Sequence, residues 1–259
     1  MFRGLVSAFQ TITALPVPGR ASDKPEDAFY WFPWVGLTLG ALAYACARGC
    51  LLLLGGVPAE CACLAWFLAA AITVALLAYL TRGFHLDGLA DMCDGFGGGW
   101  SAERALEIMR DSHIGSFGVI ALVLCLFLKT AALALMLGQG RGLYLLAVLT
   151  LSRLAMVYQA AFNVYARRQV SKVSMANHFI DRACSRHFVI ALAHAAAVLA
   201  LAVILGCAWM KVLQLALLAW LVSASLGHLS RKQVGGVTGD ILGATCEIVE
   251  CALLVAAAL

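Results

Sequence analysis

The chain has 259 residues, of which 63% are hydrophobic and only 12% are charged, and its mean hydropathy is +0.92. Soluble domains carry about 25% charged residues, so this composition excludes a soluble protein and indicates an integral membrane protein. The formal net charge of +4 comes without a basic run, and therefore gives no reason to expect a nucleic-acid partner.

The chain begins with a predicted amphipathic helix inside a segment, residues 1–29, that we expect in the cytoplasm. One face of this helix is apolar and is formed by Phe2, Leu5, Val6, Phe9 and Ile12. An apolar stripe of this kind is typical of a helix that packs on a protein core or on a membrane surface.

Apolar runs near the roughly 20 residues that cross a bilayer follow. They predict an all-α, polytopic membrane protein with about seven transmembrane helices, over residues 30–54, 61–80, 114–137, 142–165, 188–208, 212–229 and 240–259. The last run differs from the others because it contains Asp240, Glu247 and Glu250.

The loops between these runs alternate in charge. Basic residues gather in segments 1–29, 81–113, 166–187 and 230–239, whereas the opposite turns hold only Arg141 and Lys211. Positively charged loops stay in the cytoplasm, so we expect these segments to share one face of the membrane and to build one site there. Without an internal repeat, residues 1–259 are expected to form a single domain.

The acidic segment 81–113 is the strongest candidate for chemistry. Asp87, Asp91 and Asp94 are spaced four and three residues apart, and so share one face of a helix. Such close carboxylates repel one another unless a cation lies among them, and their oxygens suit Mg²⁺, with Mn²⁺ as the alternative. A solvated helix end would also explain them. His85 is expected to orient a carboxylate or to transfer a proton, unless it is structural.

Two further carboxylates follow in the same segment. Glu107 and Asp111 are four residues apart and could complete a two-metal set. The alternative is an amphipathic cytoplasmic helix in which they form local ion pairs with Arg104 and Arg110.

Cations inside the predicted spans are the next candidates. Lys129 and Arg153 lie in the third and fourth spans, where basic residues usually face a polar interior. A diphosphate substrate needs cations to neutralise it, and arginine offers a fork of donors. Arg48 is an alternative that could instead extend to the membrane surface. The basic loop after Tyr165, with Arg167, suits an anionic substrate or is an ordinary cytoplasmic loop.

A glycine-rich loop, residues 230–247, precedes and enters the last span. Thr238, Gly239 and Asp240 stand at the expected helix start, where backbone N–H groups approach phosphate readily. Glu247 lies seven residues after Asp240 on the same face.

Taken together, these blocks resemble the cobalamin synthase family of adenosylcobinamide-GDP ribazoletransferases. The resemblance is carried by Leu15-Pro16-Val17-Pro18-Gly19, Phe32-Pro33-Trp34-Val35-Gly36, His85-Leu86-Asp87-Gly88-Leu89-Ala90-Asp91, Asp94-Gly95, Met109-Arg110-Asp111-Ser112, Lys129, Ser152-Arg153, Tyr165-Ala166-Arg167 and Gly235-Gly236-Val237-Thr238-Gly239-Asp240.

The resemblance implies a reaction and its setting. Adenosylcobinamide-GDP would react with α-ribazole or its 5′-phosphate to release GMP and form adenosylcobalamin or its 5′-phosphate. The reaction would need Mg²⁺, at a multi-pass protein of the cytoplasmic (inner) membrane whose active site faces the cytoplasm. The partners are then these substrates and the lipid bilayer, with a homo-oligomer or a complex with other corrinoid-pathway enzymes left open.

Our hypothesis assigns roles to the candidate residues. The metal ligands are Asp87, Asp91, Asp94, Asp111 and Asp240; the catalytic residues are Asp91, Asp94, His85 and Arg110; and the substrate-binding residues are Lys129, Arg153, Arg167, Thr238 and Gly239. The alternatives are another membrane enzyme like the CDP-alcohol phosphotransferases and a secondary transporter. The lack of a repeat and the position of the aspartates at the end of a span argue against transport.

Overall fold

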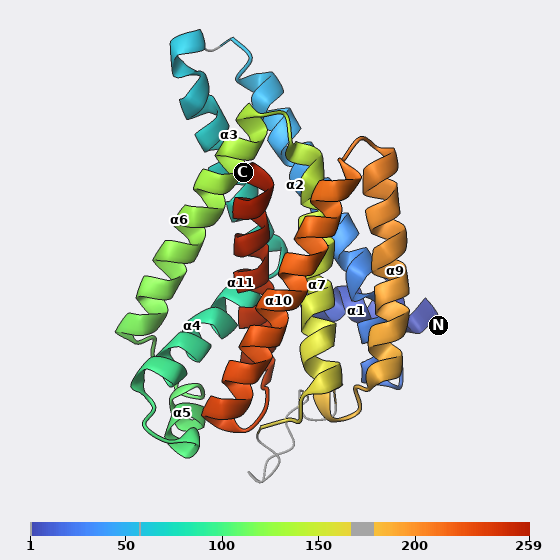
Figure 1. Cartoon of the computed structure of the whole chain (residues 1–259), viewed down its shortest axis with the longest axis vertical. Helices are drawn as coiled ribbons and strands as arrows, with labels where there is room; N and C mark the ends of the chain where they lie inside the picture. Colours follow the sequence, from blue (N-terminus) through green and yellow to red (C-terminus); the bar gives the residue numbers. More distant parts are fainter. Residues whose placement is uncertain (1, 57, 167–178) are drawn as a thin grey trace.

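The computed structural model describes residues 2–56, 58–166 and 179–259, which are almost entirely helical (Figure 1). The elements are α1 (Phe2–Ile12), η1 (Pro25–Trp31), α2 (Phe32–Leu53), η2 (Ala59–Cys61), α3 (Ala62–Leu80), α4 (Phe84–Gly98), α5 (Ala102–Ile108), α6 (Ser116–Gly138), η3 (Gly142–Tyr144), α7 (Leu145–Phe162), α9 (Ser185–Ile204), α10 (Trp209–Val234) and α11 (Gly239–Ala258).

The prediction of an all-α protein with seven membrane-crossing helices is confirmed. In the described ranges, seven helical segments are long and apolar enough to cross a membrane. The largest difference is α10, which extends to Val234 instead of ending near residue 229. The segment predicted as an acidic loop contains two helices of its own, α4 and α5.

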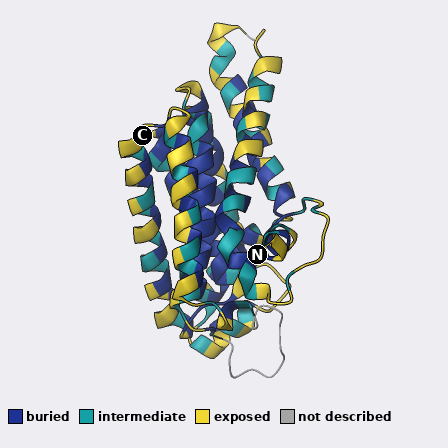
Figure 2. Cartoon of the chain, turned by 90° about the vertical axis from the view of Figure 1, so that its right-hand side faces the viewer, coloured by how far each residue is buried: buried dark blue, intermediate teal, exposed yellow. Residues whose placement is uncertain are grey.

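Two helices form the centre of the bundle. In the most apolar stretch of each span, 83% of the residues are buried in α7 and 72% in α11. The corresponding share in the other five spans is 28–33%. The outer helices are buried on one side and exposed on the other (Figure 2), and large apolar residues are frequent among the exposed ones. Exposed leucine and phenylalanine over the length of a span are what a lipid-facing surface requires. The last span, despite its carboxylates, is therefore a core helix.

Close packing of α2 on α7 depends on two glycines spaced four residues apart. A Cβ atom added to Gly36 would lie 2.5 Å from the carbonyl oxygen of Leu149, and one added to Gly40 would lie 2.7 Å from that of Leu145. Pairs of small residues at this spacing let helix backbones approach closely in membranes, where packing replaces the hydrophobic effect.

The polar segments gather at one end of the bundle. The α4–α5 segment, the end of α7 and the α10–α11 turn lie together at the bottom of Figure 1, and the α2–α3 and α9–α10 turns lie at the top. Near the lower end, the Ala166 N–H donates to the Val237 carbonyl and the Val237 N–H donates to that of Val164, each over 2.9 Å. This pairing joins two of the segments that were predicted to share a face.

The amphipathic helix predicted at the N-terminus is α1, but its buried side differs from the predicted one. Val6 and Ile12 are buried as expected, whereas Phe2 is 78% exposed. The buried side consists mainly of small residues because η1 lies against it: a Cβ atom added to Gly4 would lie 2.9 Å from the Asp27 carbonyl oxygen.

We expect Gly36→Val to destabilise the protein through the α2–α7 contact. The added side chain overlaps the α7 backbone, which cannot move away, and overpacking of this kind costs about 1–3 kcal/mol or more. The melting temperature in detergent should fall by several degrees. Gly49→Val is the matched control, because it lies in the same helix with no atom within 4 Å of its added Cβ. Equal melting temperatures for the two variants would contradict this account of the packing.

Candidate active site

The aspartate helix α4 and the start of α11 cross with their backbones in contact. A Cβ atom added to Gly88 would lie 2.5 Å from the Asp240 carbonyl oxygen and 3.0 Å from its Cα. One added to Gly243 would lie 3.1 Å from the Cα of His85. Only glycine permits this approach. The aspartate motif of α4 and the glycine-rich motif before α11, which are far apart in the sequence, therefore meet at one point.

The first turn of α11 is organised by Thr238. Its buried hydroxyl oxygen accepts the N–H of Ile241 at 3.3 Å, as an N-terminal cap, and the hydroxyl donates to Oδ2 of Asp240 at 3.2 Å. Asp240 is half-buried and begins the helix directly beside Gly88. On α4, Asp87 is exposed and Asp91 is half-buried, and they lie one residue before and three residues after the Gly88 contact.

Asp94 is committed to a different partner, the start of α6. Its two carboxylate oxygens accept the N–H of Gly115 at 2.7 Å and the N–H of Gly118 at 2.9 Å. The carboxylate is 8% exposed and lies so close that a Cβ atom on either glycine would meet it at 2.4 Å. An anion at a helix N-terminus satisfies free N–H groups and the helix dipole, so Asp94 joins α4 to α6.

Asp111 lies near Asp94, at the far end of α4 from Asp240. Both line a pocket of about 280 Å³ together with Glu107 and His113. Asp111 accepts the His113 N–H at 3.0 Å, and hydrogen bonds from His113 lower the pKa of the Asp111 carboxyl. Seven residues of helix separate Asp87 from Asp94, a rise of about 10 Å. The five predicted ligands thus divide between the two ends of α4.

Helix α5, which contains Glu107, and the turn after it, which contains Arg110, show the local arrangement that was the alternative to a metal set. Arg104 pairs with Glu107 at 2.6 Å, with both side chains exposed, and Arg110 is also exposed. In residues 2–56, 58–166 and 179–259, no three His, Cys, Asp or Glu side chains gather closely enough to hold a metal ion by themselves.

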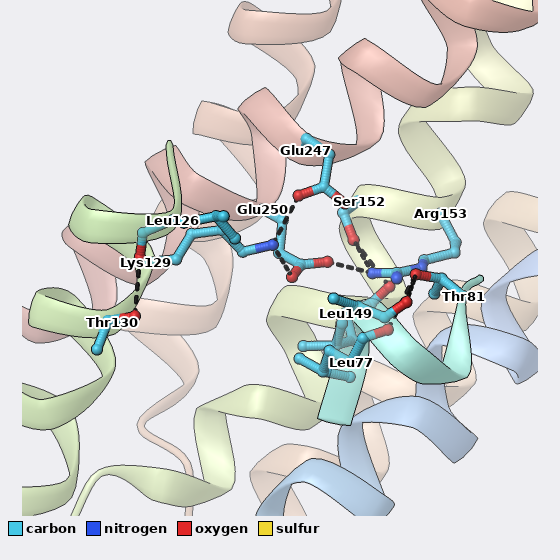
Figure 3. A network of polar contacts seen from close by, with 11 residues as sticks. Leu77, Thr81, Leu126, Lys129, Thr130, Leu149, Ser152, Arg153, Glu247 and Glu250 are labelled. Carbon is cyan, nitrogen blue, oxygen red and sulfur yellow. Dashed lines mark hydrogen bonds and ion pairs between the residues drawn. The ribbon is translucent and has the colours of Figure 1, made fainter. Parts of the chain in front are cut away.

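A buried ionic network crosses the core of the bundle (Figure 3). Lys129 of α6 lies 2.8 Å from Glu247 and 2.6 Å from Glu250, both on α11. The other oxygen of Glu250 accepts from Arg153 of α7, whose guanidinium also donates to Ser152 at 2.8 Å. All four charged side chains are at most 5% exposed, so two cations and two anions neutralise each other away from water.

This network changes how Lys129 and Arg153 are understood. They were predicted to contact an anionic substrate, and that role stays a prediction, because α11 already supplies the anions that pair with them. Glu250 was not selected from the sequence as a site residue. Its signal was present, since an intramembrane carboxylate needs a partner and Glu250 stands three residues after Glu247.

His85 lies between this network and the α4–α11 crossing. It is 3% exposed, and neither ring nitrogen has a hydrogen-bond partner in the described part of the chain. Burial, with the positive charge of Arg153 as the next cause, lowers the pKa of His85 to about 3. The imidazole is therefore neutral at physiological pH. Arg167, the remaining predicted residue, lies outside the described residues.

Comparisons with known proteins place these motifs in context. A family model described as cobalamin-5-phosphate synthase matches residues 4–258. A protein named adenosylcobinamide-GDP ribazoletransferase from Chlorobaculum parvum is 40% identical, over 100% of this chain and 96% of its own. Proteins of the same name from Chlorobaculum tepidum and Syntrophobacter fumaroxidans are 41% and 42% identical, over 100% and 98% of this chain and 96% and 97% of their own. No solved structure matches the chain.

We expect Lys129→Met to lower the free energy of unfolding by about 3–5 kcal/mol, because removing one cation leaves a carboxylate buried without its counter-charge. Thermal or denaturant unfolding in detergent would measure this. Arg48→Met is the control, since Arg48 is an exposed cation on a spanning helix and its loss buries no charge. If both variants unfold alike, the network does not stabilise the core.

Proposed function

We propose a function from the premise that the comparisons supply: the chain belongs to the cobalamin-5-phosphate synthase family. We infer that it is an adenosylcobinamide-GDP ribazoletransferase, which transfers the cobinamide-phosphate group of adenosylcobinamide-GDP to α-ribazole or its 5′-phosphate. The observation that carries this assignment to a site is the backbone contact between Gly88 and Asp240, because it brings the two acidic motifs of the chain to one point.

The donor atoms at this crossing fit a hard divalent cation. Asp87, Asp91 and Asp240 would hold Mg²⁺, or Mn²⁺ in its place, through carboxylate oxygens. Substrate phosphates and water usually complete the coordination of Mg²⁺, and here they would do so beside these carboxylates. When bound, the cation would neutralise charge on the diphosphate and on the departing GMP.

The acceptor hydroxyl would react at the phosphorus on the cobinamide side of the diphosphate. Its oxygen forms the new bond to that phosphorus, and the bond from the same phosphorus to the bridging oxygen breaks. GMP leaves with the bridging oxygen and its electron pair. Asp91, a half-buried carboxylate one helical turn from Asp87, would take the hydroxyl proton.

The remaining predicted residues would act around this step. Arg110 is an exposed cation on the polar end of the bundle and would attract the anionic donor, together with Arg167. Thr238 and Gly239 stand at the start of α11, where the positive end of the helix would attract a phosphate oxygen. Asp94, whose oxygens cap α6, would act by fixing α4. Neutral His85 would position a neighbouring group without adding charge.

The setting follows from the charge distribution. The segments 81–113, 166–187 and 230–239 carry most of the basic residues, and such loops stay in the cytoplasm. We therefore place the crossing on the cytoplasmic side of the cytoplasmic membrane, where a nucleotide-bearing donor is available.

We expect Asp87→Asn and Asp91→Asn each to lower the rate of GMP release by roughly 10²-fold or more, since each loses a charged oxygen ligand and Asp91 also loses a base. The assay uses protein in liposomes with adenosylcobinamide-GDP, α-ribazole 5′-phosphate and Mg²⁺, and EDTA should stop it. Glu60→Gln is the control, an exposed carboxylate of η2 at the opposite end.

Two results would count against this function. Full activity in either aspartate variant would remove the metal assignment. Well-folded wild-type protein that releases no GMP would remove the ribazoletransferase assignment, and would direct attention to other substrates of the phosphotransferase type.

A further inference from the structure

A cavity of about 820 Å³ opens beside the α4–α11 crossing. Its walls come from α1, the segment between α1 and η1, the start of α2, the end of the α3–α4 connection, α7, residues 179–182 and the first turn of α11. This volume lies in the range of about 300–1,000 Å³ that small-molecule sites occupy.

We propose that this cavity binds the acceptor as a phosphorylated aromatic nucleoside, with Arg82 and Arg182 holding the 5′-phosphate. The inference rests on the proposed function, and extends it by locating the acceptor in this cavity and naming the residues that hold its phosphate. The donor cannot be enclosed here, because a corrin macrocycle with a guanosine diphosphate attached is far larger than one nucleoside.

The apolar part of the wall suits an aromatic base. Phe32, Phe84 and Phe179 line the cavity, together with Met156. The Phe179 ring is held in place by Phe29, with ring centroids 4.3 Å apart, and by Phe32 at 6.2 Å. A flat bicyclic base of the benzimidazole type gains burial and ring contacts against such a wall, and methionine adapts to its outline.

The charged part of the wall suits a phosphate. Arg82 and Arg182 are the cations among the residues described around the cavity. Two nearby carboxylates could neutralise these arginines. Asp23 also lines the space, but Arg3 at 3.2 Å and Arg20 at 3.5 Å already pair with it. Glu26 lies 3.8 Å from Arg182, which is longer than a hydrogen bond.

The backbone of Arg82 supports the same assignment. Its φ is +54°, the one positive value among the described residues other than glycine. A bulky side chain in the left-handed region is uncommon, and strain of this kind concentrates at ligand sites. This conformation of Arg82 follows the end of α3 and turns the chain, so that Arg82 and Phe84 both line the cavity.

The cavity also lies where the acceptor hydroxyl is needed. Gly239 and Gly243 of α11 form part of its wall, as does His85 of α4. Gly243 touches His85, and Asp240 touches Gly88 one turn further along α4. A ribose in this space is therefore next to the backbone contact between α4 and α11.

Binding of the acceptor alone tests the proposal. The Kd of α-ribazole 5′-phosphate and of α-ribazole would be measured by calorimetry on the full chain in detergent, without donor. Arg82→Gln and Arg182→Gln should each raise the Kd of the phosphate about tenfold, which corresponds to about 1.4 kcal/mol, and that of the free nucleoside less than threefold. Arg48→Gln, an exposed cation outside the cavity, should change neither.

A second variant blocks the space itself. Thr11 is an exposed residue of α1 that lines the cavity, so Thr11→Trp fills it without altering the core. We expect this variant to lose binding of both acceptor forms, and to show a KM for the acceptor raised at least tenfold with kcat within about threefold at saturation.

The outcomes separate this inference from the function on which it rests. If wild-type protein releases GMP but neither arginine variant nor Thr11→Trp changes acceptor Kd or KM, the cavity is not the acceptor site and the function stands. If equal tenfold losses occur for the phosphate and the free nucleoside in the arginine variants, phosphate selection is wrong. Acceptor binding that depends on the cavity without any GMP release would overturn the function alone.

Discussion

The arrangement of the whole bundle depends on neutralising two glutamates in the membrane core. Glu247 and Glu250 can lie at that depth only beside cations, and the cations come from two other helices, Lys129 of α6 and Arg153 of α7. Unpaired, such charges are far too costly to bury, and paired they leave α11 with few alternative positions. The network therefore ties α6, α7 and α11 together before any substrate is present.

The position of α11 in turn determines the site. Its first turn is capped by Thr238 and presents Asp240 to α4, and the Tyr165–Val237 pairing fixes the loop that leads into it. On the other side, Asp94 binds the first N–H groups of α6 and so holds the far end of α4. The acidic helix is thus held by α11 near one end and by α6 near the other, and these are two of the three helices that the ionic network joins.

Much of this was accessible from the sequence, and the rest was not for identifiable reasons. The lengths of the apolar runs were enough to predict the seven spans. The spacing of Asp87, Asp91 and Asp94 was enough to predict a helix with these carboxylates on one face. The partner of each carboxylate could not be predicted from the sequence. Asp94 serves an N-terminus more than twenty residues away, and the pairing of Glu250 with Arg153 depends on the rotation of α7 and α11 about their axes. The cavity brings together α1 and α11, from opposite ends of the chain, which local patterns do not relate.

The contact between Gly88 and Asp240 has a consequence for precision. Where side chains meet across a helix interface, they can change rotamer. The distance between the helices then varies with temperature and with the residues at the interface. Where peptide units themselves touch, that freedom is absent. The separation between the α4 and α11 backbones at this point is therefore set by main-chain dimensions. It should tolerate extensive change in the lipid-facing side chains around it.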